Sequence, residues 1–170
     1  MQQPPLLPEE TLARVLRLAR FDGLSVFLLS TLFAVMAAGN GEARFAVIGL
    51  LAAGAGALEL HGVALLRHGE SRGMRWLIAS QPFLLAIIYA YCALRLSHVE
   101  IPQLPESSQE RLKAQLETLQ MTQEEFFRMV NRLTAQIVAV VATVYQGWLM
   151  IYYLRRRRAV AQAVEVPAEV

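Results

Sequence analysis

A single acidic residue inside an apolar segment is the strongest candidate for chemistry in this sequence. The stretch from residue 50 to 70, LLAAGAGALELHGVALLRHGE, is apolar and rich in small residues until it reaches Glu59 and His61. A carboxyl group in such surroundings is costly to leave in contact with lipid, and it can carry protons or bind a cation. Glu59 is therefore the predicted ion- or proton-responsive group.

Other polar side chains interrupt apolar segments at comparable depths. With a rise of 1.5 Å per residue, the distance to the nearest flanking arginine is about 12 Å for Glu59, 9 Å for Gln81, 13 Å for Gln146 and 7 Å for Ser25. These groups are predicted to form one polar layer. The supporting shell expected around Glu59 consists of Ser25, His61, Gln81, Tyr145 and Gln146.

Metal and cofactor sites are not expected. Glu59 and His61 are two residues apart, and this spacing does not place two ligands on one helical face. A single cysteine, Cys92, excludes an intrachain disulfide and a multi-cysteine metal site. The chain contains no phosphate-cradling glycine loop, nucleophile elbow or HExxH motif, so catalytic residues are not assigned and an enzyme is less favoured.

The elements that must position these groups are long apolar helices. Of the 170 residues, 55% are hydrophobic and only 18% are charged, which is unusually apolar for a soluble domain. Four stretches have about the length that a bilayer-spanning helix needs, at residues 23–39, 45–66, 76–96 and 135–154. Backbone groups in lipid must be hydrogen-bonded internally, so helices are predicted. The expected fold is an all-α integral membrane protein with a four-transmembrane-helix bundle.

The N-terminal segment, residues 1–21, precedes the first span. Its sequence PEETLARVLRLARF is amphipathic, which predicts either an interfacial helix on the inner leaflet or a cytoplasmic extension of the first span. The run at 23–39 could alternatively be the apolar core of a signal peptide. Retention of this run is favoured, because the preceding segment is long and contains Glu9 and Glu10.

The arginines indicate an orientation. They are concentrated in the N-terminal segment, in the loop at 67–75 and in the run at 155–158, whereas the loops between them are poor in basic residues or balanced by glutamates. This alternation predicts cytoplasmic N and C termini, and we assume a bacterial inner membrane. The clusters lie beside apolar runs, so the expected partner is the lipid bilayer and not nucleic acid.

A helical hairpin is predicted outside the cytoplasm, at residues 100–134 between spans 3 and 4. Thr122 and Glu125 form a capping box, which marks a new helix start. The apolar stripe of this hairpin consists of Leu112, Leu116, Leu119, Phe126, Val130 and Leu133. Its two helices could pack on each other, lie on the membrane or bind a neighbour. The three predicted regions are thus 1–21, a membrane domain at 22–158 and a mobile tail at 159–170.

Small residues in the second span predict close helix packing. Gly49, Ala52, Ala53 and Gly56 follow three- and four-residue spacing, which lets helix backbones approach. Ala52, Gly56 and Glu59 share one face, so Glu59 is expected to point toward a neighbouring helix.

Three functions are compatible with these features. The first is a scaffold or assembly subunit that acts through the hairpin and the small-residue faces, with a membrane-protein partner or as a homo-oligomer. The alternative is a homo-oligomeric channel or transporter subunit for protons or cations that uses Glu59. The third is a membrane enzyme that acts on a lipid or quinone. The scaffold is slightly favoured, because one buried glutamate and two glutamines suffice for packing, whereas a transport path is better supported by several charged groups.

Overall fold

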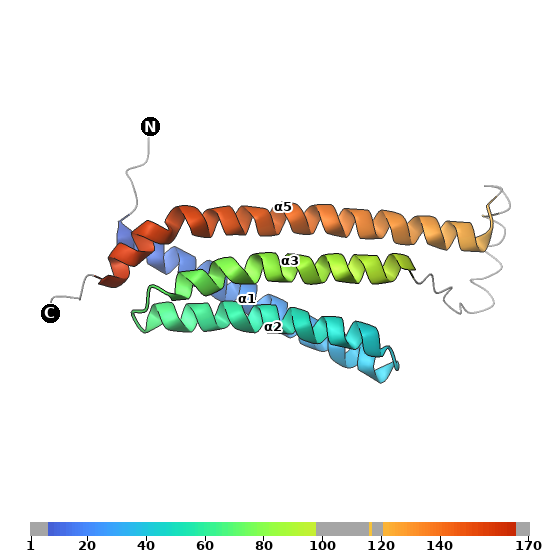
Figure 1. Cartoon of the computed structure of the whole chain (residues 1–170), viewed down its shortest axis with the longest axis horizontal. Coiled ribbons are helices and arrows are strands. Elements are labelled where there is room, and N and C mark those ends of the chain that lie inside the picture. The colour runs from blue at the N-terminus through green and yellow to red at the C-terminus, as the bar shows by residue number, and fades with distance from the viewer. Residues whose placement is uncertain (1–6, 98–115, 117–120, 166–170) are drawn as a thin grey trace, which may run out of the picture. The chain divides into compact units, whose positions relative to one another are not determined.

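The computed structural model describes residues 7–97, 116 and 121–165, and these residues are helical apart from the turns between them. The helices are α1 (Pro8–Gly39), α2 (Ala43–Arg67), α3 (Gly73–Ser97) and α5 (Gln123–Glu165), as Figure 1 shows. Within this described part there are no strands, and all four helices are long and apolar enough to cross a membrane. The prediction of four such helices is confirmed.

The two short turns use the residues that the sequence suggests. Asn40 and Gly41 follow α1, and His68 and Gly69 follow α2. Gly41 and Gly69 both have a φ of 77°, in the left-handed region that glycine adopts without a steric penalty. The chain therefore reverses direction within a few residues, and consecutive helices become antiparallel neighbours.

The N-terminal amphipathic segment is not a separate helix. α1 runs without a break through 32 residues, and its first half contains no glycine or proline after Pro8 that would interrupt it before Gly23. Val15 and Ala19 on this half are fully buried. Of the two alternatives, the structure matches an extension of the first apolar run.

Two compact units divide the chain, and the first comprises residues 1–87 and 142–170. All four helices contribute to its hydrophobic core. The buried members are Val15 and Ala19 from α1, Val63 and Leu66 from α2, Met74 and Leu77 from α3, and Leu149, Tyr153 and Val160 from α5. This core holds the helices together beside the candidate site.

The end of α5 differs from the expected mobile tail at 159–170. The helix continues through Glu165, and Val160 is fully buried in the core with Val164 packed against it. The two valines are four residues apart and so lie on one helical face. Alanine-rich sequence between them favours helix, and burial of this face anchors it. Residues 166–170 lie outside the described part.

The second unit comprises residues 88–141 and includes the end of α3 and the start of α5. Cys92 Sγ donates to the Ala135 carbonyl oxygen at 3.6 Å, and Arg95 Nε donates to Asn131 Oδ1 at 3.3 Å. Cys92 is buried and is not part of a disulfide.

The predicted capping box forms at the start of α5. The Glu125 N–H donates to the Thr122 hydroxyl oxygen at 3.2 Å, and Glu125 Oε2 accepts from the Thr122 N–H at 2.9 Å. These reciprocal bonds confirm that a new helix begins here.

Much of the predicted hairpin lies outside the described residues, including Leu112 and Leu119. Of the other stripe residues, Leu116 is buried, Phe126 is half-buried, and Val130 and Leu133 are exposed. The hairpin itself therefore stays a prediction.

Candidate functional site

Glu59 lies on the buried face of α2, with only 2% of its surface exposed. Its Oε1 oxygen accepts two hydrogen bonds, from the Tyr153 hydroxyl at 2.8 Å and from Gln81 Nε2 at 3.3 Å. The donors come from α5 and α3, so Glu59 links three helices of the first unit. Gln81 therefore does contact Glu59, as predicted.

A second carboxyl group, Asp22 on α1, lies next to Glu59. Asp22 is 6% exposed, and its Oδ1 accepts a 2.7 Å hydrogen bond from the Tyr145 hydroxyl. The following residue is Gly23, where a Cβ atom would lie 3.2 Å from Glu59 Cβ. α1 thus passes close to Glu59, at a distance where a side chain in place of Gly23 would be crowded, and the Asp22 and Glu59 carboxyl groups interact electrostatically. We call Asp22 and Glu59 the acid pair.

Buried oxygen atoms in and around the acid pair lack a hydrogen-bond donor in the part of the chain that the structure describes. Asp22 Oδ2 and Gln81 Oε1 are buried acceptors without a hydrogen-bond partner among the described residues, and so is Gln146 Oε1. Neither Asp22 nor Glu59 forms an ion pair with a basic side chain in the described part of the chain, so no such side chain neutralises the acid pair there. A buried acceptor without a donor costs about 1–3 kcal/mol, and an unpaired charge costs more. A proton or a cation would satisfy these oxygens.

The structure brings only some residues of the predicted shell next to the acid pair. Tyr145 belongs to the site, but it binds Asp22 and not Glu59. Gln146 is buried, yet its oxygen meets no donor in the described part. His61 is exposed and packs edge-to-face on Trp76 with 5.4 Å between ring centroids, because its position on α2 turns it away from Glu59. Ser25 is half-buried on α1, and no described residue hydrogen-bonds to its side chain.

The small residues of α2 produce the close approach of α1. A Cβ atom on Gly56 would lie 2.7 Å from the Phe27 backbone nitrogen, and one on Gly49 would lie 2.8 Å from Ala34 Cβ. Ala53 is buried on the same face, whereas Ala52 is half-buried. The contact face therefore runs through Gly49, Ala53 and Gly56, with Ala52 at its edge.

Two residues of the site were not predicted from the sequence. Asp22 lies directly before the first apolar run at 23–39, and Tyr153 lies at the end of the apolar run at 135–154. The available signal for Asp22 was the uninterrupted helical pattern from Pro8 onward, which places it inside a helix. For Tyr153, no comparable signal exists.

The oxygen set around the acid pair suits a proton or a hard cation. It includes carboxylate and amide oxygens, which hard cations prefer over soft sulfur ligands. Groups of three or more His, Cys, Asp or Glu side chains do not occur together in the residues described.

Comparison with known proteins does not assign a family. No family model, curated protein or solved structure matches this chain. Function is therefore inferred from the chemistry of the acid pair.

Proposed function

We propose that this chain is an integral membrane protein in which the acid pair binds and releases a proton or a monovalent cation, as the responsive site of a small channel or transporter subunit. The observation that carries this proposal is the pair itself. Two buried carboxyl groups on adjacent helices share no basic partner in the described part, and one of their oxygens has no donor.

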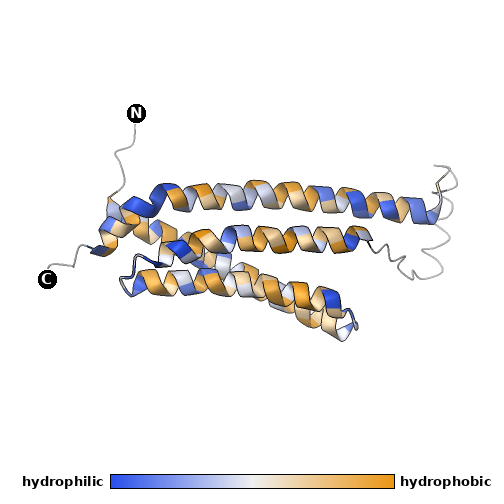
Figure 2. Cartoon of the chain, in the orientation of Figure 1, coloured by the Kyte–Doolittle hydropathy of each residue, from blue (hydrophilic) through white to orange (hydrophobic). Residues whose placement is uncertain are grey.

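The distribution of polarity supports insertion in a membrane. Large apolar side chains such as Leu29, Val35 and Val144 are 64–68% exposed, while Glu59 and Gln81 are 1–2% exposed. Figure 2 shows hydrophobic residues along the helices and hydrophilic ones gathered toward helix ends. A soluble protein would show the opposite arrangement. In a bilayer, the exposed apolar side chains contact lipid and the polar groups face the bundle interior.

The charge of the acid pair explains why it would respond to an ion. Two ionised carboxylates in contact repel each other, and this repulsion is strong where water is excluded. One negative charge is therefore expected to be neutralised by a proton or a cation. When that ion leaves, the two negative charges repel each other again. Uptake of another proton or cation from either side of the membrane would remove this repulsion.

The tyrosines couple this exchange to α5. Tyr145 and Tyr153 are eight residues apart, about 12 Å along the helix, and each donates to a different member of the acid pair. Their hydroxyls favour carboxylates as acceptors. A shift of α5 would alter both hydrogen bonds together, which gives the site a route to conformational change.

Ion flux into proteoliposomes tests the proposal. Wild-type protein is expected to conduct protons, Na⁺ or K⁺, and both Glu59→Gln and Asp22→Asn are expected to reduce that flux to the protein-free background. Glu10→Gln is the matched control, because Glu10 is an exposed acid on the same helix as Asp22. Folding of each variant is checked by gel filtration and circular dichroism.

Three results would count against the proposal. They are the absence of flux in wild-type protein, undiminished flux in both acid-pair variants, and an equal loss in the Glu10→Gln control.

An assembly role is the second candidate. Val130 and Leu133 are exposed apolar residues on α5 outside the predicted span, where a partner or a second copy could cover them. Native mass spectrometry of wild-type protein and of a Val130→Gln/Leu133→Gln variant tests this role. An oligomer that becomes monomeric in the variant supports it, and a monomer in both proteins contradicts homo-oligomeric assembly through this surface.

A further inference from the structure

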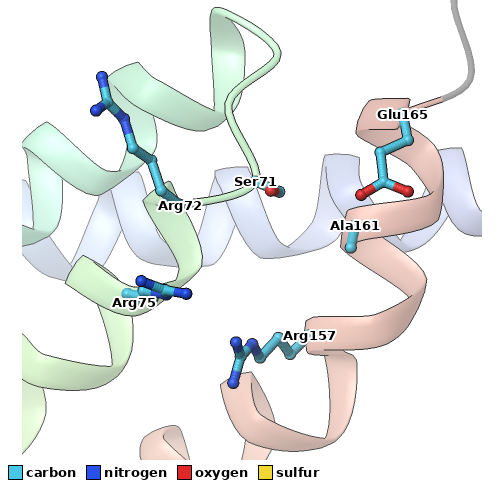
Figure 3. Close-up of a pocket in the computed structure, with 6 residues that line it drawn as sticks. All are labelled: Ser71, Arg72, Arg75, Arg157, Ala161 and Glu165. Carbon is cyan, nitrogen blue, oxygen red and sulfur yellow. The ribbon is translucent and has the colours of Figure 1, made fainter.

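A cavity of about 340 Å³ lies in the first unit, away from the acid pair. Its lining residues come from the turn before α3, the first turn of α3 and the last turns of α5, and they are Ser71, Arg72, Arg75, Arg157, Ala161 and Glu165 (Figure 3). The volume falls within the range of roughly 300–1,000 Å³ that small-molecule sites occupy.

Two arginines bring unpaired positive charge to this cavity. Arg75 and Arg157 form no ion pair within the described part of the chain. Figure 3 shows their side chains extending toward each other from α3 and α5. Arg72 is directed elsewhere and is paired with Glu70. Glu165 is the one acidic residue of the lining, so positive charge dominates.

The chemistry of these groups matches a phosphate. A guanidinium group presents several N–H donors in a planar fork that fits two phosphate oxygens at once. Two such groups facing one space, with the Ser71 hydroxyl beside them, can surround a tetrahedral anion. Because α3 begins at Gly73, the positive end of its helix dipole adds to the attraction.

We propose that this cavity binds a phosphate group, carried either by the headgroup of an anionic phospholipid or by a soluble phosphate. The proposal goes beyond the ion-responsive acid pair and does not depend on it. In the predicted topology the cavity is at the cytoplasmic ends of the helices. Basic pockets at that level between membrane helices bind anionic headgroups.

Isothermal titration calorimetry on the purified full-length protein tests this inference. The lipid arm uses detergent micelles that contain phosphatidylglycerol, with phosphatidylcholine micelles as the zwitterionic reference. The soluble arm uses inorganic phosphate, with chloride as its reference. Binding of phosphatidylglycerol alone identifies a lipid site, whereas binding of inorganic phosphate identifies a site for a soluble anion. Either result supports a phosphate site, and no saturable binding in both arms overturns it.

Matched variants separate the cavity from general surface charge. Arg75→Gln/Arg157→Gln removes both unpaired guanidinium groups and is expected to weaken binding about tenfold or more. Arg155→Gln/Arg158→Gln removes the same charge from exposed residues outside the lining, and less than about a twofold change is expected. Glu165→Gln removes the opposing carboxylate and is expected to tighten binding severalfold.

The pattern across these variants decides the outcome. Equal weakening by both arginine double variants indicates non-specific attraction and overturns the cavity as the site. Unchanged affinity in Arg75→Gln/Arg157→Gln overturns it as well. Since the substituted side chains are exposed, the variants are expected to fold, and thermal unfolding curves verify this.

Discussion

The Tyr153 hydroxyl is expected to stabilise the protein through its hydrogen bond to the buried Glu59 carboxyl group. This hydroxyl supplies the shorter of the two hydrogen bonds to Glu59 Oε1. Tyr153→Phe keeps the ring in the core but removes this donor, and we expect the free energy of unfolding to fall by about 1–3 kcal/mol. Denaturation in mixed detergent micelles, followed by circular dichroism, measures the change.

Tyr152→Phe is the control for this prediction. Tyr152 is the neighbouring residue, and its hydroxyl has no hydrogen-bond partner among the described residues, although its ring stacks on Trp148. A change below about 0.5 kcal/mol is expected there. If the two substitutions cost the same, the hydrogen bond to Glu59 contributes little to stability.

The same residues show what a sequence reveals about a buried polar site. Glu59 and Gln81 are recognisable because each interrupts an apolar run. Asp22 lies at the edge of such a run beside Arg20, where charge is ordinary, and so nothing marks it as buried. Asp22 is buried, and the next residue, Gly23, lies against Glu59 of α2. That contact is a property of two helices together, and periodicity along one of them cannot show it.

At the level of elements, the pairing of α1 and α2 depends on glycine at the contact. A Cβ atom on Gly56 would overlap the α1 backbone at Phe27, whereas one on Gly54 would meet nothing within 4 Å. Gly56→Ala is therefore expected to separate the helices and destabilise the protein by about 1–3 kcal/mol. Gly54→Ala adds the same methyl group on the open side, and we expect a neutral or slightly stabilising effect.

Unfolding of both variants in mixed detergent micelles measures this difference. Because Asp22 and Gly23 are adjacent, separation of the helices would also displace the acid pair, and loss of ion flux should accompany Gly56→Ala. Equal stability of the two glycine variants would show that the close contact is not required.

The start of α5 is predicted to depend on pH. The Thr122 backbone N–H and hydroxyl donate to the Glu125 carboxylate, and these bonds lower the pKa of Glu125 below its usual value near 4.5. A lowered pKa means that the capping contribution is complete above the unfolded-state pKa and is lost as the pH falls through the folded-state pKa. Glu125 lies outside the predicted span at 135–154. The first turn of α5 is thus expected to fray in acid.

Amide hydrogen exchange of residues 123–127, expressed as protection factors at pH 6 and pH 3, measures this fraying. Glu125→Gln retains a side-chain acceptor for the capping box but does not titrate, so its protection should be independent of pH. The same loss of protection in acid for Glu125→Gln would exclude Glu125 as the titrating group.

The helices themselves were largely predictable, and their ends less so. Apolar runs and turn residues such as Asn40-Gly41 place the end of α1 and both ends of α2 and α3 within a few residues of the observed bounds. The start of α1 is at Pro8, well before its apolar run at 23–39. α5 is longer at both ends than its apolar run at 135–154, since helix-forming polar residues extend it. The arginine run at 155–158 marks the end of the apolar segment but does not end the helix. Hydropathy defines where lipid can lie, whereas helix propensity and core packing define where the helix stops.

On the scale of the whole molecule, several polar side chains are buried and many large apolar side chains are exposed, which is the reverse of a soluble protein. This arrangement bears on both proposed sites. The acid pair is acidic and buried, and the arginine-lined cavity is basic and near the helix ends. A membrane protein that exchanges cations needs an interior acceptor, and it needs basic groups to fix its ends at the lipid headgroups. We expect both features from the one placement of the helices in a bilayer that we propose.

That placement can be tested by labelling single cysteines in intact cells. In a Cys92→Ala background, His68→Cys samples the turn between α2 and α3, and Glu124→Cys samples the exposed start of α5. A membrane-impermeant maleimide is expected to label position 124 in intact cells and position 68 only after permeabilisation. The α3 helix between the two positions is 25 residues long, about 37 Å at 1.5 Å per residue, which exceeds the hydrocarbon core. Labelling of both positions from the same side would remove the basis for a cytoplasmic phosphate site and for ion passage past the acid pair, because α3 would then not cross the bilayer as proposed.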